Sequence, residues 1–198
     1  MSTMLTFRDA KDYLMSTVDR KPSGKIPAGA QQNVWMTLMP APKDNYNEVY
    51  PSIILGDRVI ASSPEKLNSL GVTHVVNCAC GAKFNKINTS EEFFKESGIK
   101  FHGIGATDIM TYKMAPHFEA AACFIDDALN SGGKVYVHCM SGVSRSSAIV
   151  LAFLLLKRNT HLMDALKSLR EKREILPNDG YLNELVELNN KLYAPKTD

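Results

Sequence analysis

The sequence predicts an α/β fold in which helices flank a central, mostly parallel sheet. After Tyr46, short apolar segments alternate with helical patterns, and this alternation is typical of parallel strands that are buried on both faces. One strand-like segment, KVYVHC at 134–139, is followed by a glycine-containing turn and a helical stretch that is apolar on most sides. A chain of 198 residues has the size of one ordinary domain with some terminal excess.

The elements follow from local patterns of apolar and turn-forming residues. The N-terminal pattern predicts a short amphipathic helix, and a proline- and glycine-containing stretch after it, which includes Trp35, predicts an irregular linker. We expect strands at 48–56, 73–79, 99–106 and 134–139, and helices at 3–17, 63–71, 89–98, 115–133, 144–158, 161–173 and 179–192. The expected organisation is an N-terminal helix and linker (1–45), one domain (46–193) and a short tail (194–198).

Composition and charge exclude several classes of protein. The 23 basic and 21 acidic residues give a net charge of only +2, which does not indicate binding to nucleic acid or to an anionic membrane. The longest strongly apolar run, Ala148 to Leu156, is far shorter than the roughly 20 residues that span a bilayer. The charged N-terminus does not resemble a signal peptide, so we expect a protein of the cytoplasm, with the nucleus as a second location. The sequence does not indicate the oligomeric state.

Cys139 lies where a strand gives way to a helix, within the stretch CMSGVSR. A tight turn at this place directs backbone N–H groups and the positive end of the helix dipole to one point, which favours a phosphate dianion. The same groups stabilise a thiolate and lower the pKa of the cysteine. Arg145 offers a planar fork for two phosphate oxygens, and the hydroxyl of Ser146 is placed to donate to the sulfur. The alternative is a cysteine that only packs in the core.

The segment His138-Cys139-Met140-Ser141-Gly142-Val143-Ser144-Arg145-Ser146 resembles the HCxxGxSRS signature of protein tyrosine phosphatases in its dual-specificity form. The resemblance begins near Tyr46, continues through THVVNCA and the helix at 115–130, and ends in REILPNDGYLNELVELN. It is strongest to the small, atypical dual-specificity phosphatases, which consist of little more than a catalytic domain. It therefore implies a protein tyrosine phosphatase-like fold.

The resemblance also implies a mechanism. Cys139 would attack phosphorus to form a cysteinyl-phosphate, Arg145 would hold the phosphoryl group, and Ser146 would assist the departure of sulfur. Asp108, in a loop between a predicted strand and a predicted helix, matches the general acid of the family; its alternative is an ordinary turn aspartate. His138 and Asn178 would support the loop. Arg173 matches a basic position that can favour a second phosphate, or else it is a solvated charge.

The remaining residues of the loop, Met140, Ser141, Gly142, Val143 and Ser144, would surround the phosphate together with Arg145. The sequence contains no segment like the phosphotyrosine-recognition loop of the larger tyrosine-specific enzymes, which favours a shallow pocket and dual specificity. We therefore expect phosphoprotein substrates and neither a metal nor another cofactor. Two alternatives stay open: a phosphate-binding module without turnover, and a phosphatase for phosphoinositides, phosphorylated glucans or RNA 5′-phosphates.

Two cysteines of the segment Cys78-Ala79-Cys80 raise a separate hypothesis. With His74 they suggest a metal site, but a second closely spaced pair of ligands is missing. If this segment neighbours KVYVHC in the sheet, Cys78 or Cys80 could form a reversible disulfide with Cys139; core packing is the alternative. A dinucleotide site at Gly103 and Gly105 is disfavoured because Asp108 takes the place of the third glycine.

Overall fold

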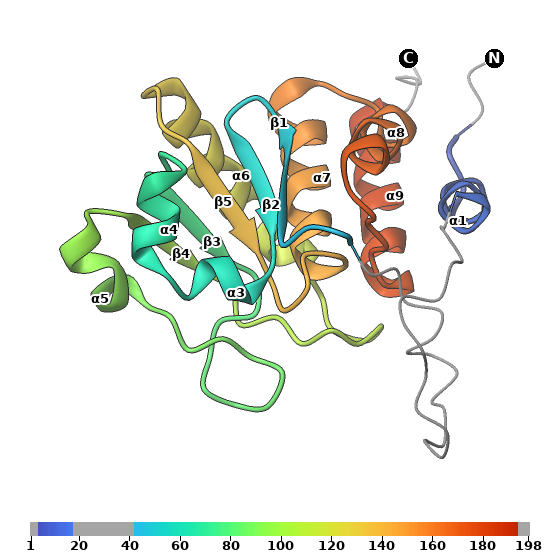
Figure 1. Cartoon of the computed structure of the whole chain (residues 1–198). Coiled ribbons are helices and arrows are strands. Elements are labelled where there is room, and N and C mark those ends of the chain that lie inside the picture. Colours follow the sequence, from blue (N-terminus) through green and yellow to red (C-terminus); the bar gives the residue numbers. More distant parts are fainter. Residues whose placement is uncertain (1–3, 18–41, 194–198) are drawn as a thin grey trace.

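A five-stranded sheet forms the centre of the molecule (Figure 1). The computed structural model describes residues 4–17 and 42–193. The strand order is β1-β2-β5-β3-β4, with β2, β5, β3 and β4 parallel and β1 antiparallel at one edge. The predicted α/β fold is therefore confirmed. The strands are β1 (Tyr46–Tyr50), β2 (Ile53–Gly56), β3 (His74–Asn77), β4 (Lys100–Gly103) and β5 (Val135–His138).

The segment 48–56, predicted as one strand, is the larger part of a hairpin. It contains most of β1 and all of β2, which pair in antiparallel register. A turn at Pro51 and Ser52 separates them, and Ser52 has a φ of 62°. Glu48 accepts a hydrogen bond from the backbone N–H of Ser52 through Oε1 over 2.9 Å. Proline has no N–H to give to a sheet ladder, so the chain reverses here.

Helices cover both faces of the sheet (Figure 1). Side chains alternate between the faces along each strand: Ile54 of β2 packs with one group of helices, whereas Ile53 and Leu55 pack with the other. The first group is α3 (Arg58–Ala61), α4 (Pro64–Ser69) and α5 (Glu91–Phe94), followed by a 3₁₀ turn (Lys95–Ser97). The second group is α6 (Ala115–Asn130), α7 (Arg145–Arg158), α8 (Leu162–Lys172) and α9 (Asp179–Tyr193).

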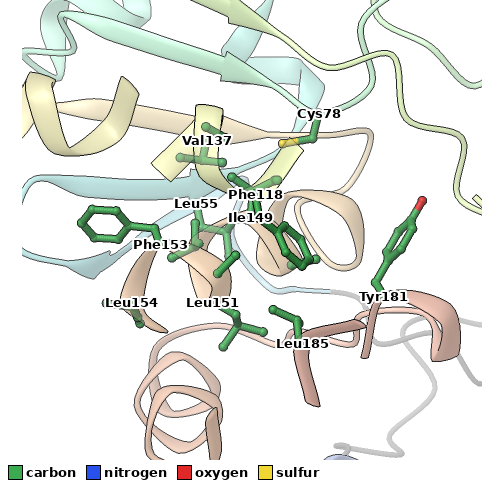
Figure 2. Close-up of a cluster of buried hydrophobic side chains, with 14 of the residues drawn as sticks. Leu55, Cys78, Phe118, Val137, Ile149, Leu151, Phe153, Leu154, Tyr181 and Leu185 are labelled. Atoms are coloured by element: carbon green, nitrogen blue, oxygen red, sulfur yellow. The ribbon is translucent and has the colours of Figure 1, made fainter. Parts of the chain in front are cut away.

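Helix α7 is the central element of the larger core. Its residues are buried continuously from Arg145 to Leu155. Figure 2 shows Ile149 and Phe153 near Leu55 and Val137 of the sheet, and Leu151 near Leu185 of α9. Truncating such a buried leucine to alanine typically costs about 2–5 kcal/mol. This packing fixes the N-terminus of α7, where the predicted phosphate-binding loop lies.

Helix α1 (Phe7–Ser16) packs against α9 and α8 through Ala10 and Leu14, which are both buried. It begins with a capping box between Thr6 and Asp9. The predicted linker around Trp35 and the predicted tail lie outside the described residues, apart from the last residues before β1. In the part of the chain that the structure describes, no helix is both long and apolar enough to cross a membrane.

Candidate active site

The loop 139–144 connects the end of β5 to the start of α7, at the carboxyl edge of the parallel strands. Ligands of open parallel sheets bind at this edge. The side chain of Cys139 is almost completely buried, and Arg145 at the start of α7 is only 2% exposed. The structure thus places the two residues with the strongest sequence signal at one buried point.

Four carbonyl groups of the loop are hydrogen-bonded to donors outside it. The backbone N–H of Arg58 donates to Met140 O over 3.2 Å, and that of Leu176 donates to Val143 O over 3.0 Å. Arg173 donates to both carbonyls between them, from Nη2 to Ser141 O and from Nε to Gly142 O, each over 2.9 Å. The N–H of a trans peptide points opposite to its C=O. The N–H groups that follow these carbonyls therefore face inward and form a site for an anion.

Gly142 allows the loop to turn this tightly. Its φ is +69°, and a Cβ atom at this position would lie 2.5 Å from Gly56 O and 2.8 Å from Arg173 Nη2. Only glycine fits both the backbone conformation and the space. The predicted turn is thus closed against the end of β2.

Opposing effects set the charge of the Cys139 thiol. Burial alone raises its pKa, but the positive charge of Arg145, the Ser146 hydroxyl and the backbone N–H groups of Ser146 and Val143 together lower it below its usual value. Ser146 Oγ lies 3.3 Å from Cys139 Sγ. Cys139 therefore lies where a thiolate is favoured, as the sequence predicted.

His138 precedes the cysteine and is completely buried. Burial lowers the pKa of its imidazole to about 4, so the ring is neutral at physiological pH. Its Nδ1 donates to Cys139 O over 3.4 Å, whereas Nε2 has no hydrogen-bond partner among the described residues. The ring contacts the backbone of the loop rather than the phosphate site.

Arg145 is held by a loop that the sequence did not associate with the site. Its Nη1 donates to Asn85 O over 3.0 Å and to Ala106 O over 3.4 Å, and Nη2 lies 3.4 Å from Asn85 Oδ1. Asn85 has a φ of 60° in the segment after β3. Within 4–17 and 42–193, Nε of Arg145 has no hydrogen-bond acceptor; the nearest carboxylate oxygen, Asp108 Oδ2, is 3.6 Å away.

Asp108 lies beside the phosphate-binding loop. Its Oδ1 accepts hydrogen bonds from Ser144 Oγ over 2.7 Å and from Asn178 Nδ2 over 2.8 Å. Asn178 also donates its backbone N–H to Ser144 Oγ and accepts one from Tyr181 N at the start of α9. The structure therefore brings Asp108, Ser144, Arg145 and Asn178 together. The side chain of Ser144 contacts Asp108 instead of lining the anion site.

Arg173 is not the solvated charge that was one of the two expectations for it. It is only 3% exposed, which excludes a solvated charge. In addition to the two loop carbonyls, its Nη1 donates to Asp44 O over 3.0 Å and to Asn47 Oδ1 over 2.6 Å. All three nitrogens of the guanidinium thus donate hydrogen bonds to the loop, to Asp44 or to Asn47. Carbonyl acceptors contributed by a turn do not show in the sequence pattern, which is why the burial of Arg173 could not be predicted.

The two cysteines after β3 have different surroundings. Asn77 pairs with His138 in the sheet, and the backbone N–H of Cys78 donates to His138 O over 2.8 Å. Cys78 and Cys139 are buried in the same core cluster. Cys80 faces elsewhere: its Sγ donates to Thr89 O over 3.5 Å. In the part of the chain with described coordinates, no three His, Cys, Asp or Glu side chains are grouped to hold a metal ion.

Comparison with known proteins identifies the family. Residues 53–191 match the family described as "Dual specificity phosphatase, catalytic domain". Dual specificity protein phosphatase 13B of Mus musculus is 40% identical over 166 residues, which are 83% of this chain and 82% of that protein. Dual specificity protein phosphatase 26 of Bos taurus is 40% identical over 147 residues, which are 74% of this chain and 68% of that protein. The crystal structure of human DUSP28 superposes with a TM-score of 0.66 at 25% identity, covering 77% of this chain and 98% of that one.

The chain therefore belongs to the dual specificity phosphatase family. It is a protein phosphatase that hydrolyses phosphotyrosine and phosphoserine or phosphothreonine, and the cysteinyl-phosphate intermediate is general to this family. The resemblance noted in the sequence is thereby confirmed.

Proposed function

We propose that Cys139 is the nucleophile, Arg145 the phosphate ligand and Asp108 the general acid of this phosphatase. The observation that carries the proposal is the outward tethering of the four loop carbonyls, which directs N–H groups at the point where Cys139 and Arg145 meet. Preorganised donors of this kind stabilise the charge that develops on transferred phosphoryl oxygens.

In the first step, the Cys139 thiolate attacks phosphorus as the bond between phosphorus and the leaving oxygen breaks. The loop N–H groups and Arg145 Nε bind the phosphoryl oxygens. Asp108 donates its proton to the leaving oxygen, so that the product leaves as a neutral alcohol or phenol. The distance of 3.6 Å between Arg145 Nε and Asp108 Oδ2 supports this role for Asp108.

In the second step, water attacks the cysteinyl-phosphate. The Asp108 carboxylate accepts a proton from the water, and the bond between phosphorus and sulfur breaks. Ser146 donates to Sγ over the 3.3 Å seen in the structure, which favours departure of the thiolate. Inorganic phosphate is released, and the thiolate and the protonated acid are regenerated.

Exposed apolar side chains next to these residues favour phosphoproteins as substrates. Phe84 is fully exposed and precedes Asn85, which contacts Arg145; Ile109 and Met110 follow Asp108 and are 51% and 65% exposed. Such side chains suit contact with a polypeptide around a phosphorylated residue. The net charge of +2 and the free cysteines favour such substrates in the cytoplasm or nucleus over anionic polymers such as RNA.

Hydrolysis of para-nitrophenyl phosphate in the presence of a chelator tests the proposal. We expect turnover by the wild type, none by Cys139→Ser, and a loss of about 10²-fold or more in Asp108→Asn. A folded and reduced wild-type protein that binds vanadate without turnover would instead support the phosphate-binding module.

A further inference from the structure

One face of α9 contacts the loop that carries Asp108. We call residues 104–114, between β4 and α6, the acid loop. Tyr181 and Glu184 are three residues apart and lie on one side of the helix, and Asn178 directly precedes its first residue. Each of them contacts this loop or its end. Asn178 contacts the Asp108 carboxylate directly; the other two contact only the backbone.

Tyr181 holds the first part of the acid loop. Its side chain is completely buried, and its hydroxyl donates to Thr107 O over 2.6 Å. Figure 2 shows the ring extending from α9 with its hydroxyl directed away from the helix. Because Thr107 directly precedes Asp108, this hydrogen bond fixes the peptide from which the acid projects.

Glu184 holds the other end. Its Oε2 accepts hydrogen bonds from Met114 N over 2.8 Å and from Ala115 N over 3.0 Å. These N–H groups belong to the start of α6, where a helix lacks internal acceptors. Glu184 is only 6% exposed, so little solvent competes for these bonds.

Gly180 brings α9 close to the middle of the same loop. A Cβ atom at Gly180 would lie 2.1 Å from Met110 O, so the two backbones are in direct contact. The start of α9 is in turn tied to α1 by an ion pair of 2.5 Å between Lys11 and Asp179. Helix α9 is thus anchored on its other side as well.

We propose that Tyr181 and Glu184 are positioning residues that hold Asp108 at the phosphate site. The inference rests on the proposed role of Asp108 as general acid. A proton is transferred only when the acid lies within hydrogen-bonding distance of the leaving oxygen, and the acid loop has no helix or strand of its own to fix it. Lys86, Arg145 and the end of β3 bond its first residues, 104–106, and α9 contacts it from Thr107 onward, at Thr107, Met110 and Met114.

Leaving groups of different basicity test this proposal. Phenyl phosphate needs the acid more than para-nitrophenyl phosphate, because phenoxide is the more basic leaving group. Removing one backbone hydrogen bond in Tyr181→Phe should lower kcat/KM for phenyl phosphate by about three- to tenfold, and by less than about twofold for para-nitrophenyl phosphate. Glu184→Gln keeps the shape of the side chain but not its charge. It should also lower the ratio of kcat/KM for phenyl phosphate to kcat/KM for para-nitrophenyl phosphate.

Tyr193→Phe is the matched control on the same helix. The hydroxyl of Tyr193 donates to Leu155 O and Thr160 O, far along α9 from the acid loop. This variant should leave the ratio of the two substrates unchanged. Equal losses for both substrates in Tyr181→Phe, or the same ratio change in Tyr193→Phe, would overturn the inference in favour of a purely structural role.

A double variant separates this inference from the proposed function. In an Asp108→Asn background, Tyr181→Phe should not change the substrate ratio further, because the group that it positions is gone. A further change of the ratio there would refute positioning of Asp108. If Asp108→Asn alone hydrolyses both substrates as the wild type does, the acid role of Asp108 fails first and the inference falls with it.

Discussion

The hydroxyl oxygen of Ser146 lies 3.3 Å from the Sγ atom of Cys139. Burial raises the pKa of the thiol, but Arg145 and, to a smaller extent, this contact with Ser146 lower it, and the pKa lies below its usual value. Ser146→Ala should therefore raise the pKa of the thiol. It should also slow the second chemical step by about tenfold, since a hydrogen bond to a charged group contributes about 1.5 kcal/mol.

Two measurements check this expectation. The rate of alkylation by iodoacetamide across pH gives the pKa of the thiol, and rapid-mixing kinetics should show a burst of nitrophenol as phosphoenzyme accumulates. Ser147→Ala is a matched control, because the Ser147 hydroxyl donates to Val143 O and Ser144 O and not to sulfur. A burst of equal size in both variants would contradict the role of Ser146.

Gly142→Ala should abolish activity. The residue has a positive φ, and the new methyl group would meet Gly56 O and Arg173 Nη2. Gly132→Ala is the control: Gly132 has a φ of +75°, and a Cβ atom there would have no neighbour within 4 Å. The control should lose only the about 1–2 kcal/mol of a left-handed alanine and keep its phosphatase activity. Urea denaturation and para-nitrophenyl phosphate turnover of both variants measure the difference.

Arg173→Lys should impair the loop although it keeps the positive charge. A lysine ammonium cannot reproduce the fork that binds Ser141 O and Gly142 O together. We expect weaker inhibition by vanadate, with the inhibition constant raised by about tenfold. Lys172→Ala, at the exposed neighbouring position, should leave inhibition unchanged. If Arg173→Lys weakened only the binding of doubly phosphorylated peptides, that result would support the expected second-phosphate role instead.

His138 should make stability depend on pH. Burial holds the pKa of its imidazole at about 4 in the folded protein, against an ordinary value of 6.5. Between these values the unfolded chain binds more protons, so the free energy of unfolding falls as pH is lowered from 6.5 towards 4. The loss is on the order of 3 kcal/mol. Urea denaturation at several pH values should show a shallower dependence in His138→Gln; an identical slope would contradict this assignment.

Site residues that are close together in the sequence could be predicted, because a single strand, turn and helix determine how they lie relative to one another. Cys139, Gly142 and Arg145 are of this kind. Asn85, Tyr181 and Glu184 could not be predicted, since each contributes a contact to a distant backbone group that no periodic pattern reveals.

The strand boundaries show the same limit. The strand expected at 73–79 is shorter: β3 ends at Asn77, before Cys78, and Cys80 pairs in an isolated bridge with Ile87. The chain turns between the two cysteines, and alternation no longer applies. Pro51, by contrast, carried a turn signal within the segment predicted as one strand.

The position of Cys78 next to Cys139 leads to a redox prediction. A hydroperoxide oxidises the Cys139 thiolate to a sulfenic acid and is itself reduced to hydroxide or alkoxide. Attack by the sulfur of Cys78 then forms the disulfide and releases water. Cys78 follows Asn77, whose partner in the sheet is His138, so the two cysteines extend neighbouring strands by one residue. Neighbouring strands lie about 5 Å apart, within the Cα separation of disulfides.

Mild peroxide treatment followed by mass spectrometry should therefore detect a Cys78–Cys139 cross-link and none that contains Cys80. Burial and, less strongly, the nearby Cys139 thiolate raise the pKa of Cys78, which favours the protonated thiol in the reduced protein. Dithiothreitol should restore the activity of the oxidised wild type and of Cys80→Ser. Cys78→Ser should lose activity irreversibly, because sulfenic acid without a partner thiol proceeds to sulfinic acid. If dithiothreitol fully restored the activity of oxidised Cys78→Ser, Cys78 would have a role in core packing alone.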